Sequence, residues 1–324
     1  MIDKVSINFL IHKHERKHFL RGILYFLSKV KDENKQLLRI NFLVSDHSLA
    51  SYVEKMIREI DNFVMDCNII VFQGGLNYPD KVECMISQDC KYTVKWDEDF
   101  FVNNYALDYM IENRKILDDP KNLAFAPLSS TGIPTSELFV NSFFDSEDIK
   151  ELHEEILRVN FPNIWGYDYS HLNEFTVGSE TWNGDLFYES TNKINYHYRG
   201  INPYRVGSKL QNLINQKILK NTSKFLEKND YNQVILNRYC CNHMVMILTE
   251  DYRKIVEDKS LFVDPFEEVP LNEYRNKNNL NFIFVEGAFG IHTMYNTIYD
   301  QDNNVQNEQD FYNGLEKIIM EKTN

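Results

Sequence analysis

The first third of the chain alternates short apolar runs with amphipathic segments. Runs with the length and alternation of β-strands cover 4–11, 39–44, 68–72 and 91–96. Segments with apolar residues at helical spacing separate these runs, at 19–30, 48–60 and 79–88. Because this alternation is typical of βαβ units, we predict the α/β class, with a Rossmann-like, mainly parallel sheet flanked by helices. Ser48 is the predicted N-cap of the second helix.

Beyond residue 100, periodicity predicts further helices and strands. The helices are expected at 103–118, 146–158, 209–226, 243–256 and 309–322, and the strands at 122–128, 234–236 and 280–289. A long polar and aromatic region covers 160–205. No stretch resembles a flexible linker. We therefore expect one continuous globular domain with two functional halves, 1–100 and 101–324.

The composition is that of a folded, acidic protein. The chain has 324 residues, and its 48 Asp and Glu against 35 Lys and Arg give a net charge of −13. Uniform acidity repels phosphates, so we expect no nucleic-acid partner. The five cysteines are odd in number and lack C-x-x-C spacing, which favours a cytoplasmic protein with reduced thiols. Since no apolar run has the length of a membrane span and the start lacks a signal-peptide pattern, we expect no integral membrane segment.

Two carboxylates stand where the fourth predicted strand ends, in the stretch Trp96-Asp97-Glu98-Asp99. In open α/β sheets, ligands collect at the carboxyl ends of the strands. A pair of Asp side chains at that place suits a hard divalent cation that also binds phosphate oxygens. The alternative is an acidic turn without a ligand.

Several common motifs are absent. The chain has no P-loop and no Gly-x-Gly-x-x-Gly after its first strand, which argues against a P-loop nucleotide site and a dinucleotide cofactor. His14 and His18 have the i, i+4 spacing of a metal site. Because basic residues flank both, a basic entry to the first helix or a phosphate contact is the stronger interpretation.

The order of these features resembles that of GT-A-fold, metal-dependent (DxD) glycosyltransferases, family-2-like. The matching stretches are Val44-Ser45-Asp46 after the second strand and Lys95-Trp96-Asp97-Glu98-Asp99-Phe100 after the fourth. Looser matches are Phe266-Glu267-Glu268-Val269-Pro270 and Phe289-Gly290-Ile291-His292. The resemblance covers 4–128 and, less closely, 260–296, whereas 130–255 matches no pattern of the family.

The resemblance implies a GT-A-like fold, with a nucleotide-sugar-binding half and a C-terminal acceptor-binding half. It implies transfer of a sugar from a nucleotide-sugar donor to a glycan or saccharide acceptor, as in polysaccharide biosynthesis, with a UDP-sugar favoured. Mn²⁺ or Mg²⁺ would be held by Asp97, Asp99 and His292, and Asp97 could instead contact the nucleotide. Residues implied in nucleotide binding are His12, Asp46, Tyr78, Lys81 and Asp97.

Inverting members of the family take a catalytic base from an acidic segment, which here implies Glu268, with Glu267 as the second choice. The alternative for both is a solvated loop charge. Trp165 and Trp182 lie among Gly, Asp and Asn, and are candidates for stacking on acceptor sugars. The alternative for them is a place in the core.

Two other functions stay open. A sugar nucleotidyltransferase shares a doubly wound start and acidic metal ligands, but it normally needs a Gly-rich basic loop after its first strand. Here the stretch from His12 to His18 is basic, yet no glycine occurs before Gly22. A non-catalytic glycan-binding protein on the same scaffold is the second alternative.

Overall fold

A computed structural model describes the residues 2–11, 19–60, 63, 65–72, 78–86, 89–130, 135–156, 163–164, 167–168, 208–236, 240, 242–261, 268–293 and 310–318. By packing, the chain divides into two compact units. Unit 1 comprises Met1–Pro127 and Lys228–His292, and unit 2 comprises Leu128–Glu227 and Thr293–Asn324. The functional halves 1–100 and 101–324 stay a prediction.

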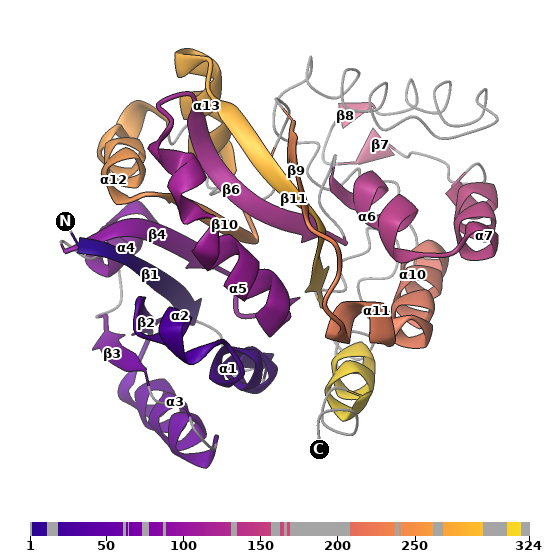
Figure 1. Ribbon diagram of the computed structural model, residues 1–324, viewed down its shortest axis with the longest axis horizontal. Coiled ribbons are helices and arrows are strands. Elements are labelled where there is room, and N and C mark those ends of the chain that lie inside the picture. The colour runs from indigo at the N-terminus through magenta and orange to yellow at the C-terminus, as the bar shows by residue number, and fades with distance from the viewer. Residues whose placement is uncertain are drawn as a thin grey trace. The chain divides into compact units, whose positions relative to one another are not determined.

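Unit 1 is organised around a nine-stranded sheet (Figure 1). In spatial order its strands are β3 (Asp66–Val71), β2 (Leu38–Val44), β1 (Ile2–Ile11), β4 (Cys90–Trp96), β10 (Met244–Leu248), β6 (Asn122–Ser129), β11 (Asn281–His292) and β5 (Phe100–Val102), and β9 (Asn232–Ile235) also pairs with β11. The neighbours from β3 to β4 are all parallel. The predicted α/β class with a Rossmann-like parallel sheet is therefore confirmed.

Helices connect and cover these strands. They are α1 (Leu20–Ser28), α2 (Asp32–Lys35), α3 (His47–Glu59), α4 (Tyr78–Met85), α5 (Asn104–Glu112), α12 (Thr249–Glu257) and α13 (Glu268–Asn278), with 3₁₀ turns at Arg114–Asp118 and Lys259–Leu261. Helix α12 packs on β4 and against α4. On the other face of the sheet the rings of Phe42, Phe9 and Trp96 form a row, with centroids 5.5 and 5.2 Å apart.

The predicted helix 243–256 is wrong in its first part. Residues Met244–Leu248 form β10, which lies antiparallel between β4 and β6, and the helix α12 begins only at Thr249. The five residues are consecutive and apolar, and four of them are buried. A strand buried on both faces has no alternation, so periodicity alone does not separate it from a helix.

The N-cap of α3 is Asp46 and not Ser48. The Asp46 carboxylate accepts hydrogen bonds from the backbone N–H groups of Ser48 and Leu49, at 2.9 and 3.0 Å. Asp is as good an N-cap as Ser, and its charge also interacts favourably with the helix dipole. The helix therefore begins at His47, two residues before the start that a Ser48 N-cap would give.

Unit 2 contains α6 (Thr135–Phe143), α7 (Ser146–Ile156), α10 (Ser208–Lys220), α11 (Thr222–Leu226), a helix over 310–318, and the short antiparallel pair β7 (Asn163–Ile164) and β8 (Tyr167–Asp168). Helices α7 and α10 pack together. Lys217 on α10 is buried and lies 2.7 Å from Asp148 on α7. In the part of the chain that the structure describes, none of the helices combines the length and the hydropathy needed to cross a membrane.

Candidate functional site

The carboxyl ends of β2, β1 and β4 meet at one edge of the sheet. In the parallel register Ile11 pairs with Val44, and Phe9 pairs with Trp96. Asp46 follows β2 after one residue, and Asp97 follows β4 directly. The structure therefore places both predicted carboxylates at the edge where open α/β sheets bind ligands.

The Asp97–Asp99 turn is held by backbone and side-chain hydrogen bonds. The Phe100 N–H donates to the Asp97 carbonyl at 3.2 Å, and the Trp96 indole donates to the Phe100 carbonyl at 2.6 Å. The Asp97 N–H donates to the carbonyl of His243, just ahead of β10, at 2.8 Å. These bonds fix the direction in which the chain leaves β4.

Asp99 and His292 come together although they are far apart in the sequence. Strand β5 starts at Phe100, and Phe100 pairs with His292 at the end of β11. Asp99 Oδ1 consequently lies 3.3 Å from His292 Nε2, and both side chains are 4% exposed. Of the three predicted metal ligands, these two are in contact.

Sequence reasoning missed His243. Its ring stacks on that of His292, with centroids 4.1 Å apart and planes 26° apart, and Phe100 lies 5.3 Å from the His243 ring. His243 is buried and directly precedes β10. Helical periodicity over 243–256 hides the position of His243, which stands just ahead of a strand. The register of β10 against β4 is what brings it here.

Lys95 is the second residue that sequence reasoning missed. Its side chain is buried, and its ammonium donates to Asp97 Oδ1 and, at 2.9 Å, to the Asn242 carbonyl. Alternation along β4 was the available signal, because it places Lys95 on the same face as Thr93, which is also buried. The Asp97 side chain is more open, at 22% exposure.

The donor atoms at this place suit Mn²⁺, since carboxylate and imidazole are both among its common ligands. Within the described residues, no three His, Cys, Asp or Glu side chains form a cluster that could hold a metal ion. A cation would thus have Asp99 and His292 as protein ligands, with Asp97 already bound to Lys95. That donor set fits a cation that takes its remaining ligands from phosphate and water.

The other predicted residues are placed only in part. Lys81 lies on α4 with its ammonium 4.7 Å from the ring centroid of Phe72, which follows β3. Tyr78 and Glu268 are the first residues of α4 and α13, and their side chains are not among the described parts. The remaining candidates lie outside the described residues, namely His12, Glu267, Trp165 and Trp182.

Helix α13 is tied to the segment that borders Asp97. Its Asn272 accepts from the Cys240 N–H at 2.8 Å and donates to the Cys240 carbonyl at 2.9 Å. Cys240 stands two residues ahead of Asn242, whose carbonyl accepts from Lys95. Glu268 is the first residue of this helix, four positions before Asn272.

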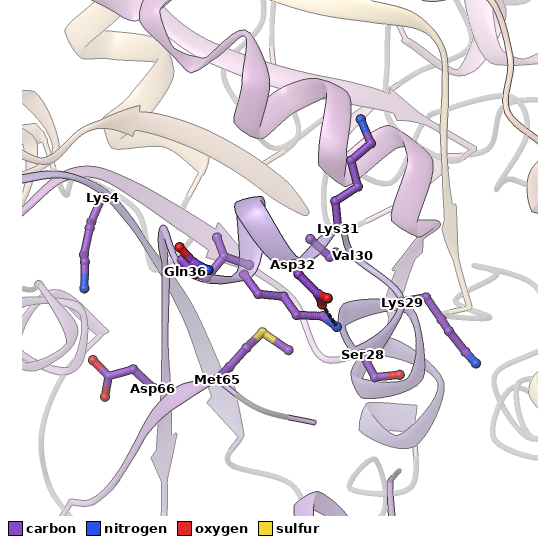
Figure 2. Close-up of a pocket in the computed structure, with 11 residues that line it drawn as sticks. Lys4, Ser28, Lys29, Val30, Lys31, Asp32, Gln36, Met65 and Asp66 are labelled. Carbon is purple, nitrogen blue, oxygen red and sulfur yellow. Dashed lines mark hydrogen bonds and ion pairs between the residues drawn. The ribbon is translucent and has the colours of Figure 1, made fainter. Parts of the chain in front are cut away.

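A large cavity of about 950 Å³ lies at the opposite edge of the sheet. It is lined by Lys4, Leu38 and Asp66, near the starts of β1, β2 and β3, and Figure 2 shows Lys4 and Asp66 on its wall. Ligands in open α/β sheets bind at the carboxyl ends of the strands. The cavity therefore does not belong to the candidate site.

Lysines on the wall of this cavity have acidic partners. Lys35 lies 3.0 Å from Asp32, and Lys31 lies 2.5 Å from Glu112. The hydrogen bond with Glu112 raises the pKa of Lys31 above its ordinary value. These two ammonium groups are therefore each engaged by a carboxylate.

Comparisons with known proteins give no family. No protein-family model matches the chain. A segment of 147 residues is 29% identical to the bifunctional 3-dehydroquinate synthase/phosphatase of Fusobacterium nucleatum subsp. nucleatum. The match covers 40% of this chain and 22% of that protein, so the chain spans less than a quarter of the length of this curated relative.

Three solved structures are similar at low TM-score. The mannosyltransferase PcManGT from Pyrobaculum calidifontis, in complex with GDP-Man and Mn²⁺, gives 0.33 at 15% identity, over 52% of this chain and 50% of that chain. HddC from Yersinia pseudotuberculosis gives 0.28 at 14% identity, over 38% and 57%. The 4-diphosphocytidyl-2C-methyl-D-erythritol synthase from Anaerococcus prevotii gives 0.44 at 9% identity, over 95% and 96%. At these TM-scores the similarities carry no argument about function.

Proposed function

We propose that the chain is a metal-dependent glycosyltransferase of the hexosyltransferase type, which moves a sugar from a nucleotide-sugar to a glycan or saccharide acceptor. The observation that carries this proposal is the buried contact of 3.3 Å between Asp99 and His292. Asp99 stands three residues after the end of β4, at the edge where parallel sheets bind ligands. The contact between Asp99 and His292 offers one oxygen and one nitrogen donor to a cation that binds a diphosphate.

Loss of a nucleoside diphosphate from the donor needs stabilisation of the negative charge that develops on the phosphates. Bound Mn²⁺ or Mg²⁺ would supply this stabilisation as a Lewis acid. In the proposal Asp99 and His292 hold the cation. Asp97 either joins them or accepts a hydrogen bond from the nucleotide, and a UDP-sugar is the favoured donor by the resemblance of the sequence.

The nucleotide would occupy the carboxyl edge beside β1 and β2. Asp46 supports this, because it stands at that edge and would accept a hydrogen bond from the base. Lys81 supports it as well, since its ammonium lies near Phe72 past the end of β3. His12 and Tyr78 complete the proposed nucleotide contacts.

Glu268 is the proposed catalytic base, and Glu267 is the alternative. The base would take the proton of an acceptor hydroxyl while the oxygen bonds to the anomeric carbon and the bond to the diphosphate breaks. This direct displacement inverts the configuration of the sugar. The tie between Asn272 and Cys240 supports the choice, because it holds α13, the helix that begins at Glu268, beside the segment leading to Asn242. Trp165 and Trp182 are the proposed acceptor contacts.

The test is turnover with a panel of UDP-, GDP- and CDP-sugars, with MnCl₂ and separately with EDTA. We expect release of a nucleoside diphosphate that needs Mn²⁺ and that Asp99→Asn abolishes, whereas the surface variant Lys254→Met keeps it. Release of pyrophosphate from a nucleoside triphosphate and a sugar phosphate would identify a nucleotidyltransferase instead. Glycan binding that is indifferent to nucleotide and Mn²⁺, without turnover, would identify a binding protein.

A further inference from the structure

We propose that Lys95 is a positioning residue of the donor site, which holds the Asp97 carboxylate and the segment before β10 in the arrangement that donor binding requires. The inference rests on the proposed function, since it names a residue of the same site. Lys95 was not among the predicted site residues. It belongs to β4 and is the last residue but one of that strand.

Burial of the Lys95 ammonium is unfavourable by itself. Lys95 is 5% exposed, and an ammonium taken out of water costs several kcal/mol unless good partners compensate for it. Its partners here are Asp97 Oδ1 and the Asn242 carbonyl at 2.9 Å. A buried ion pair of this kind is rarely more stable than an apolar pair of the same volume, so its presence calls for another role than stability.

A row of polar residues runs across the sheet beside Lys95. Lys95 is in register with Asn8, which is in register with Asn41. The Asn8 side-chain oxygen already accepts from Asn41 at 2.7 Å and from Ser6 at 3.0 Å, and these two bonds use its two lone pairs. This oxygen therefore does not serve the ammonium. Lys95 instead donates toward the strand end, to Asp97.

The hydrogen bonds from Lys95 to Asp97 and to Asn242 reach both sides of the proposed donor site. One bond fixes Asp97, the first carboxylate of the turn, and the other fixes the carbonyl before His243. The His243 carbonyl accepts from the Asp97 N–H, and its ring stacks on His292, the partner of Asp99. Loss of the Lys95 ammonium would therefore disturb both sides of the proposed donor site without a direct contact to Asp99 or His292 being removed.

The experiment uses Lys95→Met, which keeps the length of the side chain and removes the charge, together with Asp97→Asn and the double variant. Thr93→Val is the matched control, because Thr93 is buried on the same face of β4 and bonds to Thr249 at 2.9 Å, away from the site. Isothermal titration with UDP and GDP, each with MnCl₂, measures affinity. The thermal midpoint of each variant measures folding.

We expect Lys95→Met to weaken nucleotide binding at least about tenfold, as small displacements of positioned groups do. Thr93→Val should lower the thermal midpoint without changing affinity. In the Asp97→Asn background the loss of Lys95 should change affinity less than about twofold, because coupled residues are not additive. If Lys95→Met alone fails to fold, the double variant removes both charges of the pair, and a loss of affinity in it relative to Asp97→Asn would contradict the inference.

Three results would overturn the inference. Folded Lys95→Met with the affinity of the unaltered protein would make the lysine merely structural, while the proposed function would stand. An equal loss of affinity with and without Asp97→Asn would show that Lys95 does not act through Asp97. If the unaltered protein binds no nucleoside diphosphate with Mn²⁺, the proposed function is wrong and the inference falls with it.

Discussion

Gly290 lies so close to Phe100 that no side chain fits between them. A Cβ built on Gly290 would stand 1.9 Å from Phe100 Cζ. The Phe100 ring in turn contacts both His243 and His292, at 5.3 and 6.3 Å between centroids. Glycine at this position therefore allows β11 to approach β5, and this approach brings His292 to Asp99.

Gly290→Ala should destabilise the protein by about 1–3 kcal/mol, because an overpacked core must shift its neighbours. It should also weaken Mn²⁺-dependent nucleotide binding. Gly314→Ala is the control, because there the new Cβ would meet the flexible end of Leu219 at 3.3 Å in a helix. The control should change stability by less than about 1 kcal/mol. Equal midpoints for both variants in urea unfolding would contradict the role given to Gly290.

The thiol of Cys67 should be unreactive at ordinary pH. Burial raises the pKa of Cys67 to about 12, so at pH 8 only about one thiol in ten thousand is ionised. Cys67 and Cys84 both line a cavity of about 500 Å³, and Cys84 is exposed. Iodoacetamide at pH 8 followed by peptide mass spectrometry should label Cys84 well before Cys67. Labelling of Cys67 at the same rate would show that its thiol is not held protonated.

At the level of elements, the sequence predicted best where one face of a strand or helix is polar. Strands β1 to β4 and helix α3 all lie within a few residues of their predicted positions. Strand β10 could not be predicted, because a continuous apolar run has neither the strand period nor the helix period. The short strand β5 could not be predicted for another reason. Its pairing with β11 is a contact between distant segments, and local sequence does not encode such a contact.

The residues of the candidate site divide in the same way into those that local sequence suggests and those that it does not. Asp97, Asp99 and Asp46 could be proposed because each stands within three residues of the end of a predicted strand. His243 and Lys95 were missed, since their roles depend on β10 lying beside β4. Strand register is a tertiary property, and a single sequence without β10 assigned does not reveal it.

Helices α7 and α10 of unit 2 are joined by a buried ion pair. Lys217 lies 2.7 Å from Asp148 and 2.6 Å from Glu151. Burial raises the pKa of Asp148, but the hydrogen bonds from Lys217, Asn221 and Lys220 outweigh it and hold the pKa below its ordinary value. An acid with a lowered pKa in the folded state stabilises above its unfolded pKa, and this stability is lost as pH falls through the folded pKa.

Lys217→Met should therefore destabilise unit 2 by about 3 kcal/mol at pH 7, because it leaves a buried carboxylate without its main partner. The difference from the unaltered protein should shrink as pH falls toward 4, where Asp148 of the variant takes up a proton. Urea unfolding at pH 7 and pH 4.5 measures both effects. Lys254→Met removes a surface pair with Asp251 and should cost less than about 1 kcal/mol. A loss that does not depend on pH would contradict the assignment.

At the scale of the molecule, the described candidate residues all belong to unit 1. Asp46, Asp97 and Asp99 come from its first segment, and His243 and His292 come from its second, which returns after the whole of Leu128–Glu227. The site is therefore complete only when the second segment has folded onto the first. Asp99 and His292 are far apart in the sequence because Leu128–Glu227 lies between the two segments of unit 1.

The most direct measurement for the central claim is isothermal titration of a nucleoside diphosphate into the protein, with MnCl₂ and with EDTA. The account predicts binding that needs Mn²⁺, and at least about a hundredfold loss for Asp99→Asn, because removal of a charged ligand typically costs several kcal/mol. His292→Ala should show a similar loss, and Lys254→Met none. Tight binding in EDTA, or unchanged affinity in Asp99→Asn, would contradict the account.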